Sequence, residues 1–393
     1  MHSALFRAFA LCMLLAACGG AVSPAATPLP SQTITPQIVS AQAAGNREQL
    51  RSDALAAAEA KDYARVVQAL STLCADSCND QERLALGVAH DRNGQYDAAA
   101  ARFNELADKA TDAGLRREAT LRAADVAAFT GNPEQVVSSE ARLARASQGD
   151  SLFQIALAAV RARKALSAGD DAKAMHEVQN GLDLGEKAKF GDAGAPPTAL
   201  TALRFLLGEV RRTRAEAIVF DGVTPEEFMP RMEARCGNMM DAQRAYTDAI
   251  RGQDVRWAGL AGYTIAEIYT RLHKDIMRVP ASKRATTDEK KQLHFAMMHV
   301  RYRVLLEKGL DMMDRTIELA DKSKERADWA GRAKDARSGI VRAIDEEKKV
   351  LATMPYSEQE VAKALEILKR QAIEKQEKER DRLMRQGAVE TRG

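Results

Sequence analysis

The fold of this chain is decided by residues 83–111, which read RLALGVAHDRNGQYDAAAARFNELADKAT. Gly87 and Ala99 are small residues, placed where two antiparallel helices would cross closely. Gly94 would end the first helix, because a left-handed backbone costs glycine little. Phe103 would fill the space between this helix pair and its neighbour. The stretch therefore predicts a helical hairpin that stacks on similar hairpins.

Weaker copies of this turn recur along the chain, and internal repeats are the signature of stacked architectures. Lys61-Asp62-Tyr63 precedes Gly94-Gln95-Tyr96 by 33 residues, counted from Lys61 to Gly94. Gly131-Asn132-Pro133 follows Gly94 after 37 residues, and Gly169-Asp170-Asp171 follows after another 38. These offsets predict four successive hairpins over 47–190.

The pattern L-G-x6-G-x-Y-x2-A-x3-F that starts at Leu86 resembles the tetratricopeptide (TPR) repeat. It departs from that repeat at Arg83, where the repeat usually has Trp, and at Thr111, where it usually has Pro. A generic bundle of helical hairpins is the alternative. The resemblance implies a solenoid whose concave surface is lined by side chains of the first helices. In the best repeat, the partner-binding candidates that it implies are Leu84, Val88, Asp91 and Arg92.

Composition agrees with an all-α fold. The chain has 393 residues, 46% of them hydrophobic, 29% charged and only 5% aromatic, with many Ala, Leu, Arg, Glu and Lys. Such a composition is typical of folded, helical proteins rather than disordered ones. A formal charge of +3 argues against a dedicated nucleic-acid binder.

The first eighteen residues, MHSALFRAFALCMLLAAC, predict export. Arg7 is followed by the apolar segment 8–17, which would span about 15 Å as a helix, half of a hydrocarbon core. Leu15-Ala16-Ala17-Cys18 resembles a bacterial lipobox. The resemblance implies removal of a signal peptide at 1–17 and acylation of Cys18, and Gly19 after it implies an outer-membrane anchor facing the periplasm. An ordinary signal with a chance cysteine is the alternative.

The rest of the chain divides by composition. Residues 18–46 would be the lipidated cysteine and an uncharged tether with four prolines. After the repeats, FGDAGAPPT at 190–198 predicts a boundary or long loop. A second block of hairpins is expected over 199–280, and it resembles the C-terminal repeats of TPR lipoproteins from envelopes with gliding-motility machinery.

Longer, more polar helices are expected in the charged C-terminal region 286–393. Thr286 with Glu289 predicts a capping box that opens the first of them, which would run to about Leu319. A second would run over about 325–352. Ser357 with Glu360 predicts another capping box, and the helix after it is polar enough to be a solvated tail. A partner-binding coiled coil is the alternative for this helix.

Cys74 and Cys78 are four residues apart at the end of a predicted helix. We expect a disulfide, because an exported protein meets an oxidising compartment. Free buried thiols are the alternative, and neither the spacing of a zinc site nor a redox C-x-x-C motif is present. Cys236 is left over and could be buried or available to a partner.

No phosphate-binding loop, zinc-protease motif or nucleophile elbow occurs in the sequence, and we expect no cofactor and no metal. His294 and His299 are poorly spaced as co-ligands on one helix, and His273 is isolated. Glu346-Glu347 is expected to lie on a solvated helix face.

The expected function is therefore that of a non-enzymatic, lipid-anchored adaptor for proteins of the cell envelope, with no nucleic acid and no small-molecule substrate. The complex could serve motility, secretion or envelope assembly. The alternative is a peptidoglycan-acting enzyme on a helical solenoid, or a regulator of peptidoglycan synthases. An enzyme would need a cleft carboxylate with a raised pKa.

Overall fold

The computed structural model describes residues 45–190, 194–281 and 285–390, which form helices and no strand. The expected all-α fold is confirmed. The fourteen helices are α2 (Gly45–Glu59), α3 (Tyr63–Asp76), α4 (Asp80–Arg92), α5 (Tyr96–Lys109), α6 (Ala113–Thr130), α7 (Pro133–Ala146), α8 (Ser151–Ser167), α9 (Asp171–Lys187), α10 (Thr198–Glu216), α11 (Pro225–Ile250), α12 (Val255–Met277), α13 (Asp288–Ser323), α14 (Asp328–Ala352) and α15 (Glu358–Glu390).

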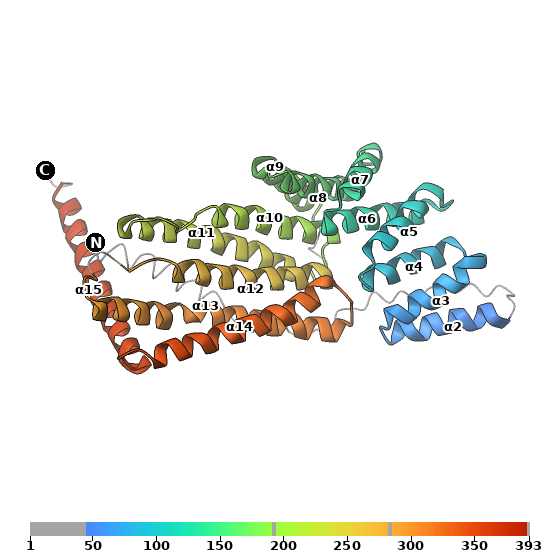
Figure 1. Ribbon diagram of the computed structural model, residues 1–393. Helices are drawn as coiled ribbons and strands as arrows, with labels where there is room; N and C mark the ends of the chain where they lie inside the picture. Colours follow the sequence, from blue (N-terminus) through green and yellow to red (C-terminus); the bar gives the residue numbers. More distant parts are fainter. Residues whose placement is uncertain (1–44, 191–193, 282–284, 391–393) are drawn as a thin grey trace.

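The helices form two blocks side by side (Figure 1). The short helices α2 to α9 pair as hairpins and stack in order along one end of the molecule. The long helices α10 to α14 lie roughly parallel or antiparallel to one another in an elongated bundle, and α15 projects from its far end. The described residues include no helix that is both long and apolar enough to span a membrane.

The hairpin turns fall where the repeat offsets predict them. Lys61, Gly94, Gly131 and Gly169 all have a positive φ, between 58° and 76°, so each ends the first helix of a pair in the left-handed conformation. In three of the four turns, the next residue is the N-cap of the second helix of the pair. Asp62, Asn132 and Asp170 cap α3, α7 and α9 with their side chains.

Gly87 is a point of close helix contact, as predicted. A Cβ atom at this position would lie 2.7 Å from a ring carbon of Phe103 and 3.3 Å from the Cβ of Arg102. Ala99 and Phe103 are fully buried in the same seam. Small residues on α4 therefore let α5 approach closely enough for the aromatic ring to pack between them.

One hydrophobic core joins α6 to α9 with the long bundle, while α2 to α5 pack in separate, smaller cores. It includes Val178 of α9 and Leu203 of α10, which lie on either side of the loop at 190–198, and continues to Trp257 of α12. The predicted break in periodicity is thus followed by a helix that packs on α8 and α9. This core therefore joins the two blocks through α6 to α9.

The C-terminal helices differ in detail from the expectation. Thr287, not Thr286, caps α13, and its hydroxyl accepts a hydrogen bond from the Lys290 amide. The error is one residue, since the two threonines are adjacent and either could cap. The capping box at Ser357 and Glu360 is confirmed, with the Ser357 amide donating to Glu360 Oε2 at 2.8 Å.

Replacing Gly87 with Leu is expected to destabilise the chain by roughly 1–3 kcal/mol, because the new side chain would overlap Phe103. Gly331→Leu is the matched control, since a Cβ at Gly331 of α14 would meet nothing within 4 Å. The control should be neutral or slightly stabilising, because Gly is a poor helix former. Urea unfolding of a chain that begins at residue 47 measures both. An unchanged midpoint for Gly87→Leu would contradict the α4–α5 packing.

Candidate functional site

The two blocks meet at a buried cluster of charged side chains that we call the junction. Arg256, at the start of α12, lies between Asp91 of α4 and Asp125 of α6. Its Nη1 donates to Asp91 Oδ1 at 2.6 Å, and its Nη2 donates to Asp125 Oδ2. The side chains of Arg256 and Asp91 are 9% and 8% exposed. The first residues of α12 therefore close over the first helices of two hairpins.

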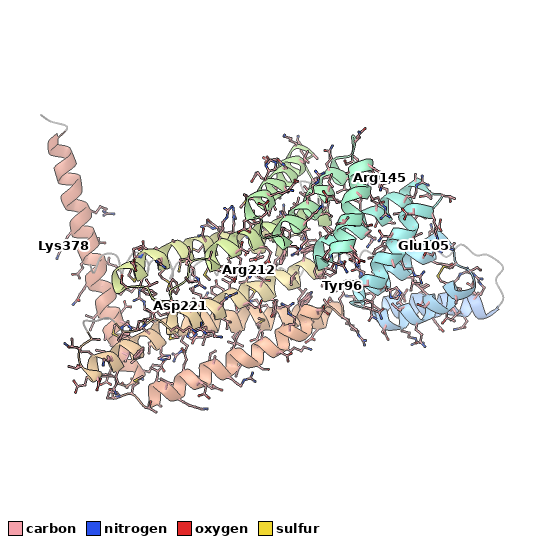
Figure 2. The ribbon with its side chains drawn as sticks, turned by 45° about the horizontal axis from the view of Figure 1, so that its top comes forward. Tyr96, Glu105, Arg145, Arg212, Asp221 and Lys378 are labelled. Carbon is pink, nitrogen blue, oxygen red and sulfur yellow. A yellow bond between two sulfur atoms is a disulfide. The ribbon has the colours of Figure 1, made fainter. Side chains whose placement is uncertain are left out.

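Aromatic side chains complete the junction. Trp257 Nε1 donates to Asp125 Oδ1 at 3.0 Å, and the Arg256 guanidinium lies 5.3 Å from the ring centre of Phe129. Trp257 also packs against Phe129 and Phe205. Figure 2 shows Tyr96 at the same meeting point of the two blocks. These contacts hold the guanidinium beside a ring and between two carboxylates.

Burial dominates the electrostatics of this site. It raises the pKa of Asp91, and it raises the pKa of Asp125 to about 6, although Arg256 acts in the opposite direction on both carboxyls. The pKa of Arg256 is raised because its partner carboxylates outweigh its own desolvation. Removing one member of such a buried set typically costs about 3–5 kcal/mol, since the others stay buried without a counter-charge.

The connection between α13 and α14 also docks on the hairpins, and we call residues 324–327 the α13–α14 turn. The Arg326 amide donates to the Arg92 carbonyl oxygen at 2.9 Å. A Cβ on Gly94 would lie 2.0 Å from the Arg326 carbonyl oxygen, so glycine is needed here for close approach as well as for its positive φ. The turn therefore covers the C-terminal end of α4.

The four residues expected to bind a partner on an open groove instead contact this chain. Val88 and Asp91 are buried, and Leu84 packs against the cores formed with Phe103 and Leu106. Arg92 is partly buried, and its Nη1 donates to the Tyr63 hydroxyl at 2.8 Å. The expectation of an open groove is thus corrected, because α12 and the α13–α14 turn cover the first-helix face of these hairpins.

A second buried cluster lies inside the long bundle. Glu347 Oε1 of α14 accepts hydrogen bonds from His273 Nε2 of α12 at 2.7 Å and from His299 Nδ1 of α13 at 3.0 Å. Glu347 is 5% exposed, so its expected place on a solvated face is wrong, while the Glu346 side chain is 68% exposed. Burial opposes ionisation of Glu347, but the two histidine contacts outweigh it and lower its pKa to about 2.

This cluster could not be predicted from the sequence, because its three members come from three different helices. One faint signal exists, since His273 shares a helix face with the buried Tyr269 and Ile276. Among the described residues, no group of three or more His, Cys, Asp or Glu side chains could hold a metal ion. The arrangement is a hydrogen-bonded acid between two imidazoles.

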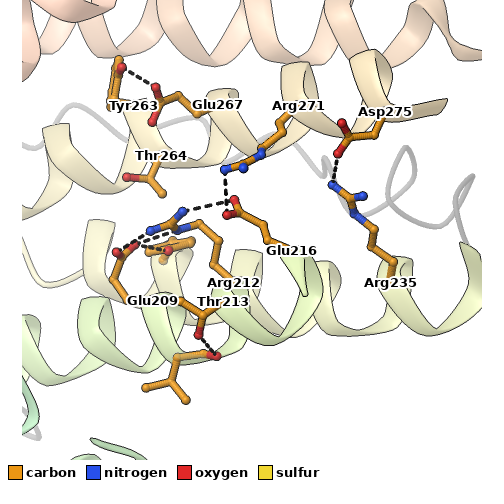
Figure 3. Close-up of polar contacts among 12 residues, drawn as sticks. Glu209, Arg212, Thr213, Glu216, Arg235, Tyr263, Thr264, Glu267, Arg271 and Asp275 are labelled. Atoms are coloured by element: carbon orange, nitrogen blue, oxygen red, sulfur yellow. Dashed lines mark hydrogen bonds and ion pairs between the residues drawn. The ribbon is translucent and has the colours of Figure 1, made fainter. Parts of the chain in front are cut away.

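A polar network ties α10 to α11 and α12 (Figure 3). Arg212 donates to Glu209 and Glu216 of its own helix, and Arg271 of α12 donates to Glu216 at 2.8 Å. Further along, Arg235 donates to Asp275 at 2.6 Å. Ion pairs thus fix α12 to both α10 and α11 beside the apolar core.

The structure joins Cys74 and Cys78 in a disulfide with Cα atoms 4.7 Å apart. It lies where α3 ends, and Arg47 Nη1 of α2 donates to the Ser77 hydroxyl between the two cysteines at 2.7 Å. Cys236 is fully buried in α11. Cys18, the expected acylation site, lies outside the described residues.

A small and mostly apolar cavity lies at the other end of the row of hairpins. It lies between α2, α3 and α4, and its charged lining is the ion pair of Arg51 Nε with Glu82 Oε1 at 2.8 Å.

Comparison with solved structures finds a likeness to a repeat protein. The crystal structure of a TPR repeats protein from Bacteroides fragilis aligns with 14% sequence identity and a TM-score of 0.27, covering 77% of this chain and 98% of that one. No protein-family model matches the sequence, and no curated protein is significantly similar to it. With so low a TM-score, the repeat architecture rests on the hairpins and turns of this chain itself.

Glu347 is expected to make stability depend on acidity. Its folded pKa of about 2 lies below the ordinary value of 4.5, so its contribution is complete above pH 4.5 and is lost as the pH falls through 2. Glu347→Gln should cost about 2–3 kcal/mol at pH 6 and much less near pH 2.

Urea unfolding at a series of pH values measures this difference. Glu346→Gln is the matched control on the neighbouring, exposed carboxylate, and it should follow the wild-type curve. A Glu347→Gln curve parallel to wild type across the whole range would contradict the ionised state of Glu347.

Proposed function

We propose that this chain is a lipid-anchored scaffold of helical hairpins that holds protein partners in the periplasm as part of an envelope-spanning complex. The observation that carries the proposal is the row of stacked hairpins, whose turns recur at Lys61, Gly94, Gly131 and Gly169. Such arrays bury their core only between neighbours and leave long outer faces for binding. The lipobox-like Leu15-Ala16-Ala17-Cys18 supports the anchor, and motility, secretion and envelope assembly are the candidate processes.

The partner contacts of this proposal lie on outer faces, because α12 and the α13–α14 turn fill the first-helix face of α4 and α6. Large apolar side chains are exposed there. Val137 of α7 is 55% exposed and Ile367 of α15 is 56% exposed. Figure 2 shows Lys378 further along α15, on the part that projects from the body.

The alternative of a peptidoglycan-acting enzyme has weaker support. The carboxyls with raised pKa values, Asp91, Asp125 and Glu325, face arginines inside the junction. Glu347 has a lowered pKa and is held by two histidines. Neither cluster offers the free proton donor in a cleft that glycan cleavage requires.

The anchor has a direct test. Cys18→Ser should abolish acylation, because the thiol is the proposed acceptor, and the mature-size, membrane-retained form should disappear. Metabolic labelling with a clickable palmitate, followed by membrane fractionation, measures both effects. Cys12→Ser is the control, since Cys12 would leave with the signal peptide and labelling should persist. Undiminished label on the Cys18→Ser chain would refute the anchor.

Partner binding is tested by placing a photo-crosslinking amino acid at Val137 or at Ile367 in the full chain in cells. Illumination should give adducts of discrete mass with envelope proteins at one or both positions, because both side chains are exposed. Val178, which is fully buried, is the control position and should give none. Absence of adducts at both exposed positions, together with release of soluble fragments from purified peptidoglycan by the intact chain, would favour the enzyme instead.

A further inference from the structure

The α13–α14 turn contains a buried carboxylate with a weak partner. The Glu325 side chain is 9% exposed, and its Oε1 lies 3.9 Å from Arg92 Nη1, beyond hydrogen-bond distance. The backbone of the turn is held more firmly, through the Arg326 amide and the Arg92 carbonyl oxygen. Lys324 Nζ also reaches the Ala60 carbonyl oxygen at 3.4 Å. An acid is thus enclosed at the contact between two blocks, with a counter-charge nearby that is too far away to form a hydrogen bond with it.

Groups from several elements surround Glu325, and their charges nearly balance, with five Lys or Arg side chains and four Asp side chains. Among them, the Arg122 guanidinium is already paired with Glu118 of its own helix at 2.6 Å. The titratable and charged groups at the junction are Tyr63 of α3, Asp91 and Arg92 of α4, Tyr96 of α5, Arg122 and Asp125 of α6, Asp254 and Arg256 of α12, Lys324 and Arg326 of the turn itself, and Asp328 of α14.

We propose that the α13–α14 turn is a proton-operated clasp: protonated Glu325 holds the turn on α4, and ionised Glu325 releases it and uncovers the end of α4 with Arg92. The clasp needs neither the lipid anchor nor a partner protein, so it goes beyond the proposed function. The movement is confined to a four-residue connection, since Trp257 and Arg256 keep the long bundle seated on the hairpins.

The direction of the response follows from the sign of the shift. Burial raises the pKa of Glu325 to about 7, and although Arg92 and Arg256 oppose this, Asp254 and Asp91 add to it. A carboxyl whose docked pKa exceeds its free value binds a proton more tightly when docked. Docking of the turn is therefore strongest in mild acid and weakens as the pH rises through 7.

Hydrogen exchange of the Arg326 amide, measured by mass spectrometry on the full chain in detergent micelles, tests the clasp. The intrinsic rate of amide exchange rises with pH in both proteins alike. The ratio of the wild-type rate to the Glu325→Gln rate at one pH therefore removes this dependence. The ratio of wild-type to Glu325→Gln exchange rates should rise about tenfold between pH 6 and pH 8, because only the wild type ionises.

Glu318→Gln is the matched control, because this carboxylate lies on α13 but is 62% exposed and pairs with Lys322. It should keep the wild-type response. A ratio that stays constant between pH 6 and pH 8 would overturn the proposal, as would faster exchange in Glu325→Gln at every pH. If the variant fails to fold, wild-type exchange at Arg326 relative to the buried amides around Ile340 of α14 decides in its place, and the same tenfold rise is expected.

Discussion

The structure depends on the enclosure of Arg256 between Asp91 and Asp125. This contact joins residues 165 and 131 positions apart in the sequence, and it sets the start of α12 against the first helices of two hairpins. A buried guanidinium is tolerated only when it is paired, so losing any one of these three side chains would leave the others buried without a counter-charge. Trp257 adds apolar contact and a hydrogen bond to the same carboxylate.

This enclosure changes where a helical repeat array can bind its partners. In an open solenoid, the first helices line a groove that is free for a ligand. Here Asp91 of α4 is used to bind Arg256 of the same chain, and the α13–α14 turn lies against Gly94. The outer faces and α15 therefore remain as the surfaces on which a protein partner would meet this chain.

Sequence reasoning found the local features and missed the long-range ones. The hairpin register, the close approach at Gly87 and the break at Gly94 each follow from residues within one turn or one helix pair, so spacing alone predicts them. The partner of Asp91 could not be predicted, because an aspartate near a helix end has the same local pattern whether it faces water or Arg256. For the same reason Glu347 was expected to be solvated, since its acidic neighbours dominate the local composition.

The two buried acids show how the same residue type takes opposite roles. Glu347 accepts hydrogen bonds from two imidazoles within 3.0 Å, and those donors stabilise the ionised form enough to outweigh burial. Glu325 faces Arg92 at 3.9 Å with other carboxylates nearby, so burial prevails and its pKa rises. The first acid stays charged over the whole neutral range and fixes α12, α13 and α14 together. Of these two acids, only Glu325 can change its charge near neutrality, which places a response to protons at the edge of the junction.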